Sequence, residues 1–245
     1  MPNAVEIQNL KVSYDDTTVL HDVNARIPAN KVTVILGGSG CGKTTLLKSI
    51  LKLTDPEKGS IKIFDEETFD LNSEAFDKYL RMSGVLFQNG ALLNSITVSE
   101  NVAIPLEQHT KLPLQVMNRI IKVKLELVGL SHAINLLPSE LSGGMKKRAA
   151  LSRAIVMDPK ILFCDEPSAG LDPVTSKNLD NLILKLKDQL NMTIVIVTHE
   201  LASIHRIADH LIFLDQGKVL FEGNLQKAKS SDNRVVKDFF AMGEF

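Results

Sequence analysis

One short stretch constrains the fold of this chain more than any other. The apolar run Val32–Leu36 leads directly into Gly37-Gly-Ser-Gly-Cys-Gly-Lys-Thr-Thr45, and an apolar stripe at helical spacing follows over residues 46–51. The spacing satisfies the pattern G-x-x-x-x-G-K-[ST] in full. The stretch therefore predicts a strand, a glycine-rich loop and a helix in that order, which is the context that the pattern requires.

The residue types of this loop suit a phosphate group. Glycine has no Cβ, so the backbone N–H groups of the loop can turn inward around an anion, and the helix that follows directs its positive dipole end to the same point. We expect Lys43 to reach the β- and γ-phosphates of a nucleotide and the Thr44 hydroxyl to bind Mg²⁺. The alternative is a glycine-rich turn that happens to precede a helix. The predicted nucleotide-binding residues here are Gly37, Gly38, Ser39, Gly40, Cys41, Gly42, Lys43, Thr44 and Thr45.

Length and composition exclude several classes of protein. The 245 residues suffice for one large α/β domain, or for a core with a subdomain. The 28 basic and 29 acidic residues give a net charge of −1, so we expect no nucleic-acid partner. No long apolar run or leader segment is present, which predicts an unexported, soluble chain. Two cysteines, Cys41 and Cys164, favour reduced, packed thiols over a disulfide framework.

Hydrophobic periodicity predicts the remaining elements. Residues 4–27 and 60–64 alternate as antiparallel strands do, and residues 74–82 and 84–87 predict a short helix and a buried strand. Residues 97–128 are helical in pattern, and another helix runs to residue 155. Strands at 160–164 and 193–197 enclose a helix, which predicts a parallel sheet, and residues 211–221 predict a hairpin. The apolar stripe of the 97–128 segment consists of Leu114, Met117, Ile120, Ile121, Leu125 and Val128.

Polar side chains follow three of the predicted buried strands. Because ligands bind beyond the carboxyl ends of parallel strands, we expect Asp165 to hold Mg²⁺ through water and Glu166 to orient or deprotonate a water that attacks the γ-phosphate. His199 is expected to contact the γ-phosphate, and Gln88 to touch Mg²⁺ or the attacking water. The alternatives are a solvated acidic turn and a structural or surface histidine, the latter being our interpretation of His205 and His210.

A second glycine motif precedes another predicted helix. In Leu141-Ser-Gly-Gly-Met145, Ser142, Gly143 and Gly144 form a second N-terminus able to accept an anion. One nucleotide does not readily need both sites in one subunit, so the second is predicted to serve a nucleotide held by another subunit. The alternative is an ordinary helix N-cap with glycines.

These residues together resemble the ATP-binding-cassette (ABC) ATPases along nearly the whole chain. Residues 37–45 are similar to the Walker A loop, Gln88 to the Q-loop glutamine, residues 141–145 to the signature motif, residues 161–166 to Walker B, residues 168–172 to the D-loop, and His199 to the switch histidine. The resemblance implies that Tyr14 stacks on adenine. It also implies a homodimer in which Ser142, Gly143 and Gly144 of one copy cover the γ-phosphate on Lys43 of the other.

The resemblance implies an α/β fold as well. The expected architecture is a P-loop NTPase core with a mainly parallel sheet, an N-terminal antiparallel β-subdomain and an inserted α-helical subdomain. We expect one ABC ATPase domain over residues 1–245, with the core and β-subdomain in 1–90 and 158–228, the helical subdomain in 91–157 and a tail in 229–245.

Met145 narrows the resemblance, because many family members have glutamine there. That stretch, with residues 84–92, 100–105 and 137–141, is similar to the ATPase of Mla-type phospholipid transporters. This implies ATP and Mg²⁺ as cofactors, and an integral membrane permease, an MCE-domain lipid-binding protein and a small STAS-type subunit as partners. It also implies a place on the cytoplasmic face of the inner membrane and phospholipid transport between inner and outer membranes.

Several alternatives stay open at this point. The apolar tail 235–245 either docks on a partner or on the second subunit, or closes the fold as an amphipathic helix. The chain could serve another import or export system. Soluble ABC proteins that act on ribosomes or DNA usually carry two cassettes or a long coiled-coil insertion, and the chain has neither. A P-loop kinase is a further alternative, against which residues 141–144 and His199 argue.

Overall fold

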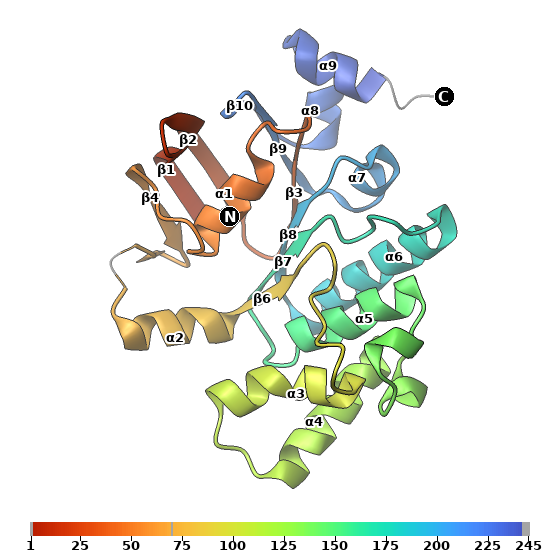
Figure 1. Ribbon diagram of the computed structural model, residues 1–245. Helices are drawn as coiled ribbons and strands as arrows, with labels where there is room; N and C mark the ends of the chain where they lie inside the picture. The colour runs from red at the N-terminus through yellow and green to blue at the C-terminus, as the bar shows by residue number, and fades with distance from the viewer. Residues whose placement is uncertain (1, 70, 242–245) are drawn as a thin grey trace. The chain divides into compact units, whose positions relative to one another are not determined.

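The computed structural model describes residues 2–69 and 71–241, which are shown in Figure 1. They form two compact units, one made of residues 1–76 with 193–245 and the other of residues 77–192. Antiparallel strands, parallel strands and helical segments are all present, so the predicted α/β fold class is confirmed. The finer subdivision into a core, a helical subdomain at 91–157 and a tail stays a prediction.

An antiparallel sheet occupies the N-terminal part of the first unit. Its strands are β1 (Asn3–Tyr14), β2 (Thr17–Pro28), β4 (Lys58–Ile63) and β5 (Glu66–Glu67), in the order β2-β1-β4-β5. Val5 and Ile7, and after a register shift Leu10 and Val12, are buried along β1, which is the pattern of a sheet with one covered face. The prediction of antiparallel strands is confirmed, although β5 is too short to show alternation.

The other strands of this unit surround β3 (Val32–Gly37), all six residues of which are buried. β3 runs parallel to both β8 (Thr193–Val197) and β9 (His210–Asp215), as continuous apolar runs predict. β10 (Lys218–Gly223) pairs with β9 as the predicted antiparallel hairpin. The loop after β3 leads into α1 (Lys43–Ile50), which buries Leu46, Leu47 and Ile50.

Three helices complete the first unit: α7 (Leu201–Ile207), α8 (Leu225–Lys229) and α9 (Arg234–Ala241). On α9, Val236 and Phe240 are buried, and the Phe239 ring meets Phe213 of β9 edge to face, with 5.2 Å between the centroids. The apolar face of α9 therefore closes this unit, which is the second alternative for the tail. Residues 242–245 of the predicted tail lie outside the described residues.

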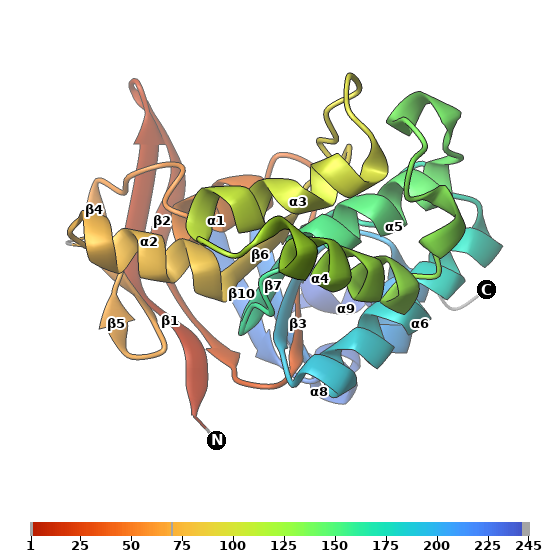
Figure 2. The same ribbon diagram turned by 90° about the horizontal axis from the view of Figure 1, so that it is seen from below.

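In the second unit, β6 (Ser83–Leu86) follows α2 (Ser73–Met82) and runs parallel to β7 (Ile161–Asp165). The helices are α3 (Val98–His109), α4 (Leu114–Leu127), α5 (Gly143–Ala154) and α6 (Pro173–Leu190), with short 3-10 turns at Ser131–Ala133 and Pro138–Glu140. Figure 2 shows α3, α4 and α5 side by side. No helix in the described part of the chain has the length and apolarity needed to span a membrane.

The predicted 97–128 segment forms two helices instead of one. The helix is interrupted between His109 and Leu114, and Pro113 has a non-helical backbone directly before α4. Met117, Ile121, Leu125 and Val128 of the predicted stripe are buried. Leu114, the first residue of this stripe, is 67% exposed. It is the first residue of α4 and lies one turn before the buried part of the helix begins.

Candidate functional site

Two glycines of the phosphate loop are required by the fold of the first unit. Gly37 and Gly42 have φ of 145° and 107°, which a residue with a Cβ rarely adopts. A Cβ on Gly37 would lie 2.0 Å from the carbonyl oxygen of Leu214, and one on Gly42 would lie 2.7 Å from Cδ2 of Leu20. These positions are closed to other residues by the chain itself.

Gly38 is different, because nothing in the described chain crowds it. A Cβ on Gly38 would meet no atom within 4 Å, and its φ is not positive. Neither backbone conformation nor internal packing therefore demands glycine here. The residue lies on the exposed surface of the loop, where the absence of a side chain lets another group approach the backbone closely.

The helix that follows the loop begins without a side-chain cap from any described residue, since its N-cap is Gly42 in the left-handed conformation. Its first N–H groups thus have no side-chain acceptor. The ammonium of Lys43 lies against the loop, where Nζ donates to the carbonyl of Gly37 at 3.0 Å and to that of Gly38 at 2.7 Å. Cys41 is a buried free thiol whose Sγ lies 3.8 Å from this Nζ, while Thr44 is exposed.

Two further predicted residues belong to the first unit. Tyr14 ends β1 and is 42% exposed, and its hydroxyl lies 3.2 Å from the hydroxyl of Thr54. His199 is exposed and follows β8 directly after the buried Thr198. Both rings are thus presented at the surface, and Tyr14 is held by a hydrogen bond at its far end.

In the second unit, two strands deliver polar residues at one end. Leu86 of β6 lies opposite Cys164 of β7, and Gln88 and Glu166 each follow this pair by two residues. Residues 161–164 are fully buried, whereas Asp165 and Glu166 are half-buried. Glu166 has φ of 44°, a left-handed conformation that costs a residue with a Cβ free energy. The structure therefore brings Gln88, Asp165 and Glu166 to the same strand ends.

The signature motif begins α5, and Ser142 is its N-cap. The Ser142 hydroxyl accepts a hydrogen bond from the N–H of Met145 at 3.3 Å, as the N-cap interpretation predicts. A Cβ on Gly144 would lie 2.7 Å from the Thr175 side chain of α6, so glycine allows close approach of these helices. Hydrogen bonds from Thr175 hold the pKa of Asp172, the N-cap of α6, below its ordinary value.

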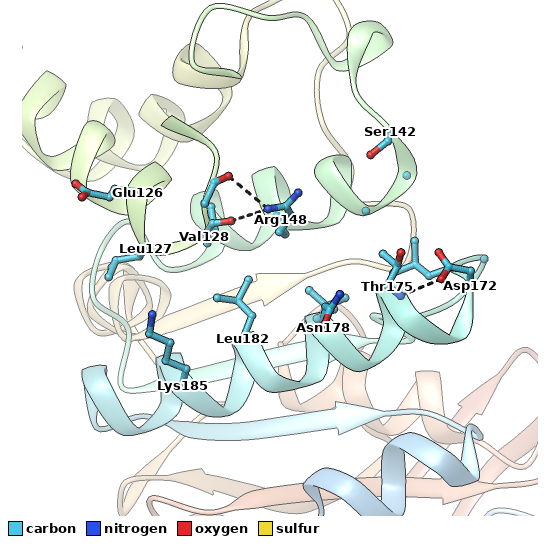
Figure 3. Close-up of a pocket in the computed structure, with 16 residues that line it drawn as sticks. Glu126, Leu127, Val128, Ser142, Arg148, Asp172, Thr175, Asn178, Leu182 and Lys185 are labelled. Carbon is cyan, nitrogen blue, oxygen red and sulfur yellow. Dashed lines mark hydrogen bonds between the residues drawn. The ribbon is translucent and has the colours of Figure 1, made fainter. Parts of the chain in front are cut away.

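A cavity of about 700 Å³ lies along the signature helix (Figure 3). Ser142 stands at one end, with Asp172 and Thr175 across from it on the first turn of α6. Farther along α5, Arg148 donates to the carbonyls of Val128 and Gly129 at 3.2 and 3.4 Å. The Ser142–Gly144 end of α5 thus borders a cavity within its own unit that both polar and apolar side chains line.

Sequence reasoning missed Lys147 of α5. It is 7% exposed, and its Nζ donates to the backbone carbonyls of Gln88 and Glu166. Burial lowers the pKa of this ammonium. The only signal in the sequence was a basic cluster, residues 146–148, at the start of a helix whose second half is rich in alanine. When a helix must be buried, a charged residue on it usually has a specific hydrogen-bonding partner.

The predicted residues thus fall into two groups. Those in the first unit are Tyr14, residues 37–45 and His199, and those in the second unit are Gln88, Ser142, Gly143, Gly144, Asp165 and Glu166.

Comparison with known proteins finds a matching family model and relatives that are ATP-binding proteins of transport systems. The family model described as "ABC transporter" matches residues 20–169. The chain is 40% identical, over 99% of its length and 91% of the relative, to the intermembrane phospholipid transport system ATP-binding protein MlaF of Haemophilus influenzae. It is 39% identical, over 96% of its length and 68% of the relative, to the probable ribonucleotide transport ATP-binding protein mkl of Mycobacterium leprae.

A solved structure of an ATP-binding cassette is also similar to this chain. It is the dimeric structure of a post-hydrolysis state of an ATP-binding cassette bound to ADP and Pi. The TM-score is 0.82 at 30% sequence identity, over 90% of this chain and 98% of that chain.

Proposed function

The chain belongs to the ABC transporter family, and from this membership we propose that it hydrolyses ATP to drive phospholipid transport through a membrane permease. It is an ATPase subunit of a membrane transport system, as its relatives are. One observation carries the cargo proposal, namely the 40% identity over 99% of the chain to a phospholipid transport ATPase. The phosphate loop supplies the chemical basis for binding ATP.

The first unit would bind the nucleotide. Lys43 would exchange the carbonyls of Gly37 and Gly38 for β- and γ-phosphate oxygens, because a charged acceptor makes the stronger hydrogen bond. The open face at Gly38 lets a phosphate approach the loop N–H groups. Tyr14 would stack on adenine, and His199 would contact the γ-phosphate.

Mg²⁺ fits the oxygen donors that the chain offers. The hydroxyl of Thr44, the amide oxygen of Gln88 and the carboxylate of Asp165 are hard ligands of the kind that Mg²⁺ prefers, and Asp165 would act through water. When bound, Mg²⁺ would neutralise charge on the β- and γ-phosphates. Thr44 belongs to the phosphate loop after β3, whereas Gln88 and Asp165 lie at the ends of β6 and β7.

Glu166 is the proposed general base. Its carboxylate would take a proton from a water whose oxygen attacks the γ-phosphorus, and ADP would leave as the bond to the γ-phosphorus breaks. Gln88 would orient this water, since Gln88 and Glu166 each follow the Leu86–Cys164 register pair of the two neighbouring strands by two residues. His199 would hold the γ-phosphate in line.

A second copy would complete the site. Ser142, Gly143 and Gly144 of one copy would cover the γ-phosphate that Lys43 of the other copy binds, as an ATP-sandwich homodimer. The dimeric arrangement of the similar cassette supports this proposal. Met145 removes the amide of the more common glutamine but leaves the Ser142 hydroxyl and the glycine N–H groups, so hydrolysis should not require that amide.

The permease would dock on the second unit, with the segment from Gln88 to Pro105 as the contact surface. An apolar groove of about 350 Å³ there is lined by Leu80, Phe87, Ile104, Pro105 and Met157 among others, and Phe87 is 41% exposed. The groove includes residues of the segment 88–105, which links Gln88 to α3. We place the complex on the cytoplasmic face of the inner membrane, with an MCE-domain lipid-binding protein and a small STAS-type subunit as further partners.

Replacement of Glu166 tests the catalytic assignment. Glu166→Gln should bind ATP and dimerise, but hydrolyse ATP at least about 100-fold more slowly, because a general base typically contributes a factor of that size. Gel filtration with and without ATP measures dimerisation, and phosphate release measures the rate. A variant that elutes identically with and without ATP would contradict the sandwich dimer.

A transport assay tests the cargo. The chain is purified with its co-expressed permease and reconstituted in liposomes that hold labelled phospholipid, with the Glu166→Gln complex as control. ATP-dependent movement of phospholipid supports the proposal. Movement of a labelled ribonucleotide and not of phospholipid would favour the second candidate, which rests on the name of the mycobacterial relative.

A further inference from the structure

Lys147 is a cation that the second unit buries almost completely. It lies on α5, five residues after the N-cap Ser142, and is 7% exposed. A buried ammonium costs stability unless other groups replace its lost water. Its hydrogen-bond partners should therefore explain why it is there.

Those partners are the carbonyl groups of two proposed catalytic residues. Nζ of Lys147 donates to the Gln88 carbonyl and, at 3.4 Å, to the Glu166 carbonyl. Both residues follow the Leu86–Cys164 register pair by two positions. One ammonium thus joins the ends of β6 and β7 to the helix that begins at the signature motif.

The backbone of Glu166 needs such support. Its φ of 44° is disfavoured for a residue with a Cβ and persists only where the surroundings hold it. The Glu166 carbonyl also accepts the N–H of Ala169 at 3.1 Å, so a turn and a cation both fix this peptide. Since φ and ψ set the direction of the Cα–Cβ bond, they also set where the carboxylate starts.

The neighbouring carboxylates favour a charged ammonium at this place. Burial lowers the pKa of Lys147, while Cys164, Glu166 and Asp165 act in the opposite direction. The carboxylates of the β7 end therefore favour the charged form of the lysine. A second cation of α5, Arg153, donates to the carbonyls of Gly90 and Ala91, both at 2.7 Å, and so holds the chain just after Gln88.

We propose that Lys147 is a positioning residue, which holds the backbones of Gln88 and Glu166 in the geometry that hydrolysis requires. The inference rests on the proposed catalytic role of Glu166. Lys147 itself touches neither nucleotide nor water in this role. It acts through the two peptides that it binds, and it links them to the helix that Ser142 begins.

Replacement of Lys147 by methionine tests this role, because methionine keeps the apolar length and removes the ammonium. We expect kcat for ATP hydrolysis to fall about 10- to 100-fold, the usual loss when a group that orients a catalytic residue is removed. The KM for ATP and the affinity for a fluorescent ATP analogue should change by less than about twofold, since the phosphate loop lies elsewhere in the sequence. Lys147→Arg keeps the charge and should recover part of kcat.

Lys124 offers a matched control. It is a second lysine of the same unit, 5% exposed, and its ammonium binds Asp158 instead of a catalytic backbone. Lys124→Met should lower Tm about as much as Lys147→Met but leave kcat of the folded protein unchanged. An equal loss of kcat in both variants would reduce Lys147 to a structural residue and overturn the inference.

A second background separates positioning from general damage. In Glu166→Gln, the loss caused by Lys147→Met should shrink to less than about threefold, because the carboxylate that it positions is gone. The same factor in both backgrounds would overturn the inference. If Glu166→Gln hydrolyses ATP at the wild-type rate, the proposed role of Glu166 fails. If Glu166→Gln is slow and Lys147→Met is as fast as wild type, the inference about Lys147 alone fails.

Discussion

Two helix N-termini carry the glycine motifs of this chain, and they are built differently. α1 follows Gly42 in the left-handed conformation, and no described side chain caps it. α5 follows Ser142, whose hydroxyl accepts the N–H of Met145 at 3.3 Å. An N-cap satisfies one of the N–H groups that have no partner within a helix. The first terminus therefore keeps more of its hydrogen-bonding capacity for a ligand than the second.

This difference indicates that the two motifs have different roles in binding and hydrolysis. The α1 terminus has a loop with an open face at Gly38 and the ammonium of Lys43 beside it, so it can bind an anion by itself. The α5 terminus is partly satisfied by its own serine, and it fits a group that arrives already bound elsewhere. Binding of ATP should therefore depend on the first motif, and hydrolysis on both.

The largest effect is expected at Lys43. Lys43→Ala should lower ATP affinity about 100-fold or more, because two charge-assisted hydrogen bonds of about 1.5–3 kcal/mol each would be lost. Titration with a fluorescent ATP analogue measures this. Lys48→Ala is the control, since Lys48 is an exposed lysine of the same helix and its loss should change affinity by less than about twofold. Unchanged affinity of Lys43→Ala would contradict our assignment of the loop.

Two neighbouring glycines separate folding from binding within the first motif. Gly37→Ala should destabilise the protein by about 2 kcal/mol or more, because the new Cβ meets the Leu214 carbonyl and its φ of 145° is strained. Gly38→Ala should keep Tm within about 2 °C, since its effect on stability is small, and lower ATP affinity about tenfold. Thermal melts and ATP titrations measure both. Equal loss of Tm in the two variants would show that Gly38 serves packing.

Ser142 tests the second motif. Ser142→Ala should lower stability by about 1 kcal/mol through loss of the cap and lower hydrolysis about tenfold, with ATP affinity of the single copy unchanged. Asn224→Ala is the matched control, because Asn224 caps α8 by accepting the N–H of Lys227 at 2.9 Å. It should cost similar stability and leave the hydrolysis rate of the folded protein as it is. Loss of ATP affinity in Ser142→Ala would contradict the proposal that ATP binding depends on the first motif alone.

The smallest effect concerns the two thiols, of which Cys41 lies in the phosphate loop and Cys164 in β7. Cys41 is 5% exposed within the phosphate loop, while Cys164 is fully buried and burial raises its pKa. A neutral, buried thiol reacts slowly, so alkylation should label Cys41 several-fold faster than Cys164, and ATP should slow the labelling of Cys41. Peptide mass spectrometry with and without ATP measures this. Equal labelling of Cys41 in both conditions would contradict a nucleotide on the loop.

Much of the fold follows from local patterns. The strand–loop–helix around residues 32–50 is set by apolar spacing and glycine positions, so its prediction from the sequence is confirmed. Of the predicted stripe on α4, Met117, Ile121 and Leu125 are buried, whereas Leu114 at the start of the helix is exposed. Periodicity tells which side of a helix is apolar, but it cannot tell where along that side the neighbouring helices stop.

The roles of individual loop residues were less accessible. Gly37 and Gly38 are adjacent and identical, yet Leu214, far along the chain, closes one position and leaves the other open. In the sequence, Lys147 is one of three consecutive basic residues, and no local pattern says that its ammonium binds the backbone beyond two strand ends. Such distinctions depend on which distant segments approach a residue.

The sequence by itself determined the nucleotide motif, the α/β class and the residues at the strand ends, because spacing of a few residues encodes each of these. Only the tertiary structure decided that α9 closes its own unit, that Gly38 faces open space, and that Lys147 binds the backbones of Gln88 and Glu166. The physical reason is that hydrogen bonds and steric contacts between distant segments form only once the chain is folded, and no short window of sequence contains both partners.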